Sequence, residues 1–229
     1  QVELGLEVED LFSAVLRHHP RALFSGEPIV VLEMKAALES LAGGRRERLF
    51  ELALAIPGLA PETLDGLGIP RDEMRGFLRR RIESAPDPRP VAETLARLIA
   101  VDFHLESMRF QGESETDVEL LRAAVARDPR MPQSLEILGD HAYLNLKDPR
   151  AAADFYARAL LAQLDEGMGI SPYRRYGDRT RWNPAHSLPI RLGCAFREAG
   201  ALEEGKKILE RVRAHPRIAT LWEDLADDA

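Results

Sequence analysis

The sequence predicts an all-α protein, and three observations lead to this fold class. Apolar residues recur at spacings of three and four along most of the chain, which is the period of an amphipathic helix. The one β-branched cluster, Ile29-Val30-Val31, runs directly into such a helical pattern. Prolines and glycines fall at the boundaries of these patterns, where helices begin and end.

The first 90 residues form a helical N-terminal region in this interpretation. Its helices are expected at 28–42, 45–56, 61–67 and 71–84. The last of these should bury Met74, Phe77, Leu78 and Ile82, which share one face. Residues 85–90 contain three prolines and are predicted to be a linker or a sharp corner. We therefore divide the chain into regions 1–90 and 91–229.

The second region contains an internal repeat. After a long amphipathic helix at 91–110 and a further helix that starts near Ser114, the segments 134–161 and 188–216 follow one pattern. Each has a Leu-Gly pair, an aromatic residue shortly after it, a turn, a small residue, and then apolar positions at helical spacing. Such a pattern predicts two helices joined by a short turn, which pack antiparallel.

This pattern resembles the tetratricopeptide repeat (TPR) over residues 98–218. The first segment matches the family at Leu135, Leu138, Gly139, Tyr143, Ala152, Tyr156 and Ala159, and the second at Leu192, Gly193, Phe196, Gly205, Leu209 and Val212. A degenerate unit with Leu121, Ala124 and Pro129 precedes them. The fold expected from the resemblance is a TPR-like α-solenoid, in which pairs cross at small residues: Gly139, Ala152, Gly193 and Gly205.

The resemblance also implies a function. Stacked TPR pairs leave a concave groove, lined by the first helix of each pair, that holds an extended peptide or a partner helix. The residues expected in this groove are Tyr143, His141 and Asn145. The Lys and Asn clamp by which some TPR proteins hold chaperone C-termini is missing, since Glu136 and Asp140 stand beside the first Leu-Gly pair.

A stretch of different composition, at about 165–185, interrupts the repeat. It gathers Arg174, Arg175, Arg179, Arg181 and Trp182. Arginine and aromatic residues are enriched at binding hot spots, so this inserted loop is a candidate site for an acidic peptide, a carboxylate or a phosphate. The alternative is a structural loop that folds back on the helices and pairs its arginines with nearby acids.

The composition argues against other functions. The net charge is −7, so a nucleic-acid partner is not expected. There is one cysteine, and we find no metal-ligand spacing and no nucleotide-binding or catalytic motif, so we expect no metal, no cofactor and no enzymatic activity. The predicted function is a protein–protein scaffold or adaptor. The alternative is an appended helical domain of a larger transferase or hydrolase that positions a substrate or partner.

Location follows from weaker signals. No run of about 18 apolar residues is present, which predicts a soluble chain. The 27 arginines against 4 lysines indicate a GC-rich, bacterial genome. We expect a cytoplasmic protein, although the chain begins at Gln1 rather than methionine, which leaves a periplasmic or membrane-tethered location open.

Overall fold

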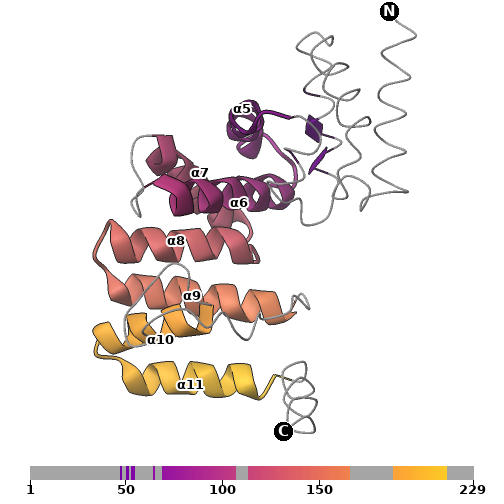
Figure 1. Ribbon diagram of the computed structural model, residues 1–229. Coiled ribbons are helices and arrows are strands. Elements are labelled where there is room, and N and C mark those ends of the chain that lie inside the picture. The colour runs from indigo at the N-terminus through magenta and orange to yellow at the C-terminus, as the bar shows by residue number, and fades with distance from the viewer. Residues whose placement is uncertain are drawn as a thin grey trace, which may run out of the picture. The chain divides into compact units, whose positions relative to one another are not determined.

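The computed structural model describes residues 69–106, 113–165 and 188–215, with a few single positions between 47 and 64. These described residues form seven helices and no strand, as the sequence predicts (Figure 1). The chain divides into two compact units, Gln1–Val101 and Asp102–Ala229. None of the described helices is long and apolar enough to cross a membrane.

The first unit contains α5 (Arg71–Ile82) and most of α6 (Arg89–Glu106). Helix α5 follows Pro70 and buries Met74, Phe77, Leu78 and Ile82, which confirms the predicted inner face. The Phe77 ring lies 5.4 Å from the Phe50 ring, centroid to centroid, so the two aromatic side chains pack in one core. The predicted helices at 28–42, 45–56 and 61–67 lie almost wholly outside the described residues.

The proline-rich stretch 85–90 contains the turn between α5 and α6. The Asp87 carboxylate accepts a hydrogen bond from the Arg89 backbone N–H at 3.0 Å, which stabilises the first turn of α6. Along α6, Val91, Ala92, Leu95, Ala96, Leu98 and Ile99 are buried. The predicted corner is therefore a sharp turn between two helices of the first unit.

The second unit contains α7 (Glu113–Arg127), α8 (Pro132–Leu144), α9 (Pro149–Asp165), α10 (Leu188–Glu198) and α11 (Leu202–Arg213). Short turns join α8 to α9 and α10 to α11, so both are antiparallel pairs. Helix α7 contacts α8, α9 contacts α10, and α11 contacts both α10 and α9. Figure 1 shows α8, α9 and α11 in successive layers, with α10 against α9.

Glycine brings the two helices of each pair together. A Cβ built on Gly139 of α8 would lie 2.5 Å from Cδ1 of Tyr156 in α9, and one built on Gly205 of α11 would lie 2.9 Å from the Phe196 ring of α10. Both distances are too short for a real side chain, so each pair packs an aromatic ring directly on a glycine of its partner helix. Ala152 is also buried completely.

Gly193 does not follow this scheme. A Cβ at this position would meet nothing within 4 Å, so the expectation that Gly193 marks a helix crossing is wrong. The Leu-Gly pair alone suggested equivalence with Gly139. In α10, however, Phe196 provides the close contact and packs on Gly205 instead.

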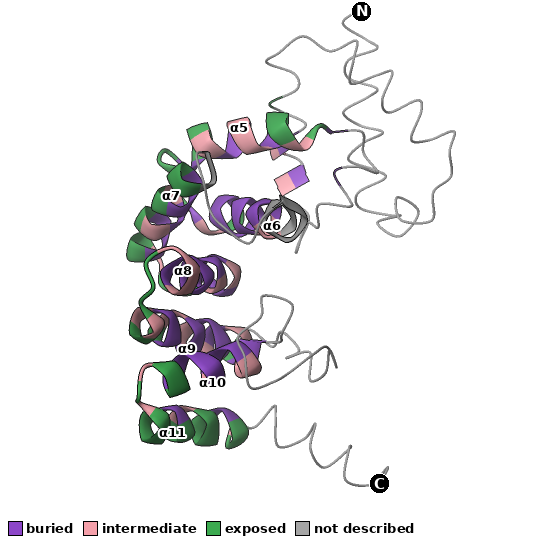
Figure 2. Ribbon diagram, turned by 60° about the vertical axis from the view of Figure 1, so that its left-hand side comes forward, coloured by how far each residue is buried: buried purple, intermediate pink, exposed green. Residues whose placement is uncertain are grey.

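Burial differs between the two pairs (Figure 2). Nine of the residues of α8 are buried, and the helix has neighbours on several sides. Helix α11, in contrast, buries only Gly205 and Val212 among its twelve residues. A helix buried on most sides belongs to the interior of a domain, whereas α11 has one packed face and a large accessible remainder.

Candidate functional site

The first helices of the two pairs, α8 and α10, are held together by a cluster of buried charges. The Arg191 side chain of α10 is only 5% exposed, and its Nη1 donates to Asp140 Oδ1 of α8 at 2.6 Å. Its Nη2 donates to Glu136 Oε1, one helical turn away on the same face of α8. The guanidinium carbon also lies 5.4 Å from the centroid of the Tyr156 ring.

Tyr156 connects α9, the second helix of the first pair, to this cluster. Its side chain is fully buried, and its hydroxyl donates to Asp140 Oδ1 at 2.7 Å. One carboxylate therefore joins three helices, since α8 supplies the acceptor, α9 the hydroxyl and α10 the guanidinium. We call Glu136, Asp140, Tyr156 and Arg191 the interhelix cluster.

Electrostatics favours a charged arginine in this cluster. Burial by itself lowers the pKa of Arg191, but the carboxylates of Asp140 and Glu136 outweigh it and raise that pKa. Burial raises the pKa of the Asp140 carboxyl, against the opposing effects of Arg191 and of the Tyr156 hydrogen bond. A buried ion pair of this kind is sensitive to the loss of either partner, because the remaining charge is left in a medium of low polarity.

Seven residues beyond the cluster's Glu136 and Arg191, the same faces of α8 and α10 carry Tyr143 and Glu198, which are more accessible. Tyr143 is half-buried, and its side chain hydrogen-bonds with Glu198 near the end of α10. Burial and this carboxylate raise the pKa of Tyr143, so its phenol is neutral and donates the hydrogen bond. Arg197 and Glu198 are exposed, and Arg197 Nη2 lies 3.7 Å from the sulfur of Cys194. We call Glu136, Tyr143, Arg197 and Glu198 the polar strip.

Of the three predicted groove residues, only Tyr143 belongs to the polar strip. Successive residues of a helix are rotated by about 100°, so His141 and Asn145 each lie about 200° from Tyr143. The three side chains therefore cannot share one groove. Asn145 is half-buried, and its backbone N–H caps α8 by donating to the His141 carbonyl at 2.9 Å.

His141 lies on the side of α8 that faces α7. It is 2% exposed, so the expectation that this histidine lines an accessible groove is wrong. Burial lowers its pKa, and the charge of Arg122 in α7 acts in the same direction, against the weaker effects of Glu115 and Glu119. A neutral histidine packed between two helices contributes to the core rather than to an accessible surface.

The inserted loop falls outside the described residues, which stop at Asp165 and resume at Leu188. The predictions for Arg174, Arg175, Arg179, Arg181 and Trp182 therefore stay predictions. Cys194 is a buried thiol.

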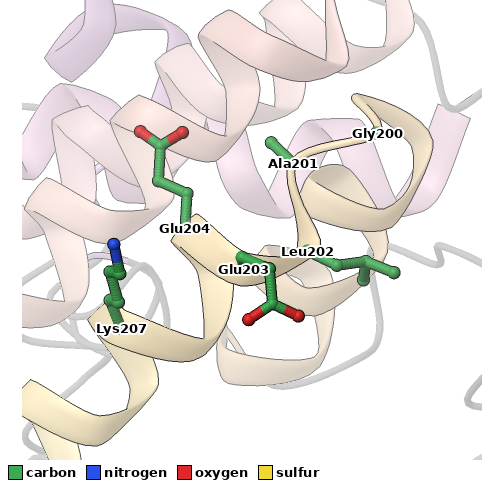
Figure 3. A pocket seen from close by; sticks show the side chains of 6 residues that line it. All are labelled: Gly200, Ala201, Leu202, Glu203, Glu204 and Lys207. Carbon is green, nitrogen blue, oxygen red and sulfur yellow. The ribbon is translucent and has the colours of Figure 1, made fainter.

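A shallow hollow lies at the turn between α10 and α11, with a volume of about 490 Å³ (Figure 3). Its lining includes Leu202, Glu203, Glu204 and Lys207. Glu204 Oε2 pairs with Arg150 at 2.6 Å, and Glu203 Oε1 pairs with Lys206 at 2.6 Å. Both acids of the hollow are therefore engaged in ion pairs at the surface, and we assign no reaction to it.

The interhelix cluster was missed at the level of sequence, although a signal existed. Arg191 interrupts the apolar run LPIRLGCAF, where a charge is unexpected on a packed helix. Glu136 and Asp140 stand four residues apart between apolar neighbours, which places them on one face of α8. Opposite charges in two predicted core helices indicate a buried pair, but the sequence does not show which helices are neighbours.

Comparisons with known proteins identified no relative of this chain. No protein-family model matches the chain, and no curated protein or solved structure matches it. Among the described residues, no group of three or more His, Cys, Asp or Glu side chains is placed to hold a metal ion.

Proposed function

We propose that this chain is a protein–protein interaction scaffold, in which a TPR-like array of helix pairs holds a peptide or a partner helix against the first helices α8 and α10. The observation that carries the proposal is the interhelix cluster. It links the two first helices through the side chain of Arg191, which pairs with Asp140 and Glu136, and accessible side chains lie farther along the same two helices.

A binding surface benefits from this arrangement because it is formed before the partner arrives. Association is weakened by every side chain and helix that must be ordered on binding. In the interhelix cluster, one arginine is held by two carboxylates of α8, and a buried tyrosine hydroxyl fixes one of these carboxylates. The residues next to the polar strip are therefore held in place by hydrogen bonds within the chain itself.

The polar strip has the chemistry of a recognition surface. Tyr143 offers a half-buried aromatic ring, a residue type common at hot spots, and Arg197 and Glu198 offer exposed charges of both signs. Glu136 is 24% exposed at its side chain, so it is accessible even though it pairs with Arg191. We expect a partner segment with both an apolar anchor and polar groups, and the inserted loop with its arginines to add contacts to acidic residues.

Site-specific photocrosslinking tests this proposal. The photoreactive residue p-benzoylphenylalanine would replace Tyr143 in one variant and Phe155 in a matched control. Phe155 is a half-buried aromatic residue of α9, and the Arg158 guanidinium lies 5.7 Å from the centroid of its ring. After irradiation in lysate of the source organism, we expect a discrete adduct at position 143 that excess unlabelled protein suppresses.

The control variant at position 155 shows whether crosslinking is specific to the polar strip. Adducts of the same pattern at positions 143 and 155 would show that the polar strip has no preference, and the proposal would fail. The absence of any competable adduct at position 143, in a variant with normal helicity by circular dichroism, would also contradict it.

A further inference from the structure

The two helix pairs differ at one level of their packing. In the first pair, a Cβ built on Gly139 would lie 2.5 Å from Cδ1 of Tyr156, so the ring fills the space between α8 and α9. The repeat equivalents in the second pair are Gly193 and Leu209. A Cβ on Gly193 would meet nothing within 4 Å, and Leu209 is 36% exposed. Among the described residues, therefore, nothing approaches Gly193 as the Tyr156 ring approaches Gly139.

The packing of α10 on α11 supports this correspondence. Phe196 of α10 packs on Gly205 of α11. In an antiparallel pair, the residue one turn earlier on one helix faces the residue one turn later on the other. Gly193 precedes Phe196 by one turn and Leu209 follows Gly205 by one turn, so the two face each other. We call Gly193 and Leu209 the open level of the second pair.

In the first pair, the same level receives a side chain from the next helix of the array. The guanidinium carbon of Arg191 in α10 lies 5.4 Å from the centroid of the Tyr156 ring, and its Nη1 donates to Asp140 beside the glycine. Helix α10 thus docks on the first pair where the glycine and the ring meet. Because repeated helix pairs present equivalent surfaces, the open level is the place where a further helix would dock.

The chemistry of the open level favours an apolar side chain over an arginine. The repeat places Ile190 and Cys194 where the first pair has its two carboxylates, and Leu209 where it has the tyrosine hydroxyl. A buried guanidinium would find no counter-charge at these three positions. Ile190 is half-buried, so apolar atoms of α10 stay accessible beside the open level. A large apolar side chain can therefore replace water from both helices.

A close approach from outside the chain also explains the glycine itself. Glycine inside a helix lowers the stability of that helix relative to alanine. At Gly139 and Gly205 an aromatic ring accounts for the missing side chain, whereas no described neighbour does so at Gly193. The absence of a Cβ lets another molecule reach the backbone of α10 at this point.

We propose that a helix of the partner protein docks at the open level and inserts an apolar side chain of the size of phenylalanine between Gly193 and Leu209. It docks there as α10 docks on the first pair. The source of this helix rests on the proposed function, because Arg197 of the polar strip lies one turn from Gly193 and is exposed. An acidic residue of the partner beside its apolar one would meet Arg197.

A peptide copy of α10 tests this docking on the full chain. The probe is a fluorescein-labelled peptide with the sequence of residues 188–200 and the substitution Arg191→Phe, and the matched probe keeps Arg191. Fluorescence anisotropy in reducing buffer measures both affinities. We expect the phenylalanine peptide to bind about tenfold more tightly, because the open level offers apolar atoms and no carboxylate to residue 191.

Variants of the full chain locate the binding. Leu209→Tyr restores the ring of the first pair, so it should keep or raise the melting temperature and weaken the phenylalanine peptide about tenfold. Leu209→Glu should weaken the peptide as well, without requiring a ring to fit. Leu146→Tyr is the matched control, because Leu146 is 57% exposed and lies in the turn after α8. It should bind the peptide as the parent does.

Several outcomes would overturn the proposal. These are equal binding of the two peptides, no measurable binding of the phenylalanine peptide to the full chain, and an equal loss in Leu146→Tyr. A parent chain that dimerises in sedimentation velocity, and becomes monomeric with Leu209→Tyr, would assign the open level to a second copy and would overturn it too. Crosslinking at position 143 is measured separately, so the proposed function and this inference can fail independently.

Discussion

The pairs α8–α9 and α10–α11 share a sequence pattern but differ in their surroundings. In the first pair, Gly139 lies under Tyr156, and Tyr156 in turn donates to a carboxylate that α10 also binds. In the second pair, Gly205 lies under Phe196, and the outer helix is exposed over most of its surface. Each hairpin thus packs an aromatic ring on a glycine, but the glycine lies in the first helix of one pair and in the second helix of the other. The position among the helices determines how much else is buried.

The largest expected effect concerns the ion pairs of the interhelix cluster, which join the first helix pair to the second. Arg191→Met should lower the free energy of unfolding by about 3–5 kcal/mol, because Asp140 and Glu136 lose their common cation inside the protein. Urea denaturation followed by circular dichroism measures the change. The triple variant that also carries Asp140→Asn and Glu136→Gln should recover part of the loss, whereas a loss below about 1 kcal/mol for Arg191→Met would refute the role of the interhelix cluster.

Two glycine substitutions sharpen the comparison of the pairs. Gly139→Ala should destabilise the protein by about 1–3 kcal/mol, since the new methyl group collides with the buried Tyr156 ring. Gly193→Ala should raise stability by up to about 1 kcal/mol, because it meets no neighbour and alanine favours the helix. Thermal melts of both variants check this. Equal effects would mean that the two Leu-Gly pairs are equivalent after all.

His141 makes the stability of the protein depend on pH. Because its folded-state pKa lies below the ordinary value of about 6.5, the unfolded chain takes up the proton first as the pH falls. The stability that comes from the neutral His141 is therefore fully present above the ordinary pKa of about 6.5, and it is lost as the pH falls toward the folded-state pKa. Its slope is at most about 1.4 kcal/mol per pH unit. Urea midpoints between pH 7.5 and 5 should show a smaller slope for His141→Gln than for the parent.

The smallest effect is expected for the surface pair between the two hairpins. Arg150 and Glu204 lie 2.6 Å apart, but their side chains are 57% and 51% exposed. Such a pair contributes less than about 1 kcal/mol, so Glu204→Gln should change the melting temperature little. Its effect should also vanish in 1 M NaCl, where screening extends over about 3 Å. A loss of stability comparable to that of Arg191→Met would show that the solvent exposure of an ion pair does not decide how much it contributes to stability.

Much of the local structure could be predicted from the sequence. The inner face of α5 follows from the spacing of its apolar residues, and the two hairpins follow from the Leu-Gly repeat and the short turns. The glycine contacts at 139 and 205 also follow, since a small residue between two large apolar groups indicates a helix crossing. The candidate binding site stays a prediction for Tyr143, which is half-buried, whereas His141 is buried and does not line an accessible surface.

The sequence by itself determined the described helices, their pairing and the close glycine contacts at Gly139 and Gly205, though not the role of Gly193, because these features depend on neighbours within a few residues or within one hairpin. Only the tertiary structure decided which helix lies next to which. It placed Arg191 beside Asp140 and Glu136, 51 and 55 residues away along the chain, and it turned His141 toward α7. The burial of a charge is tolerated only when an opposite charge from another helix lies next to it. Local sequence patterns do not predict which two helices will supply such a pair.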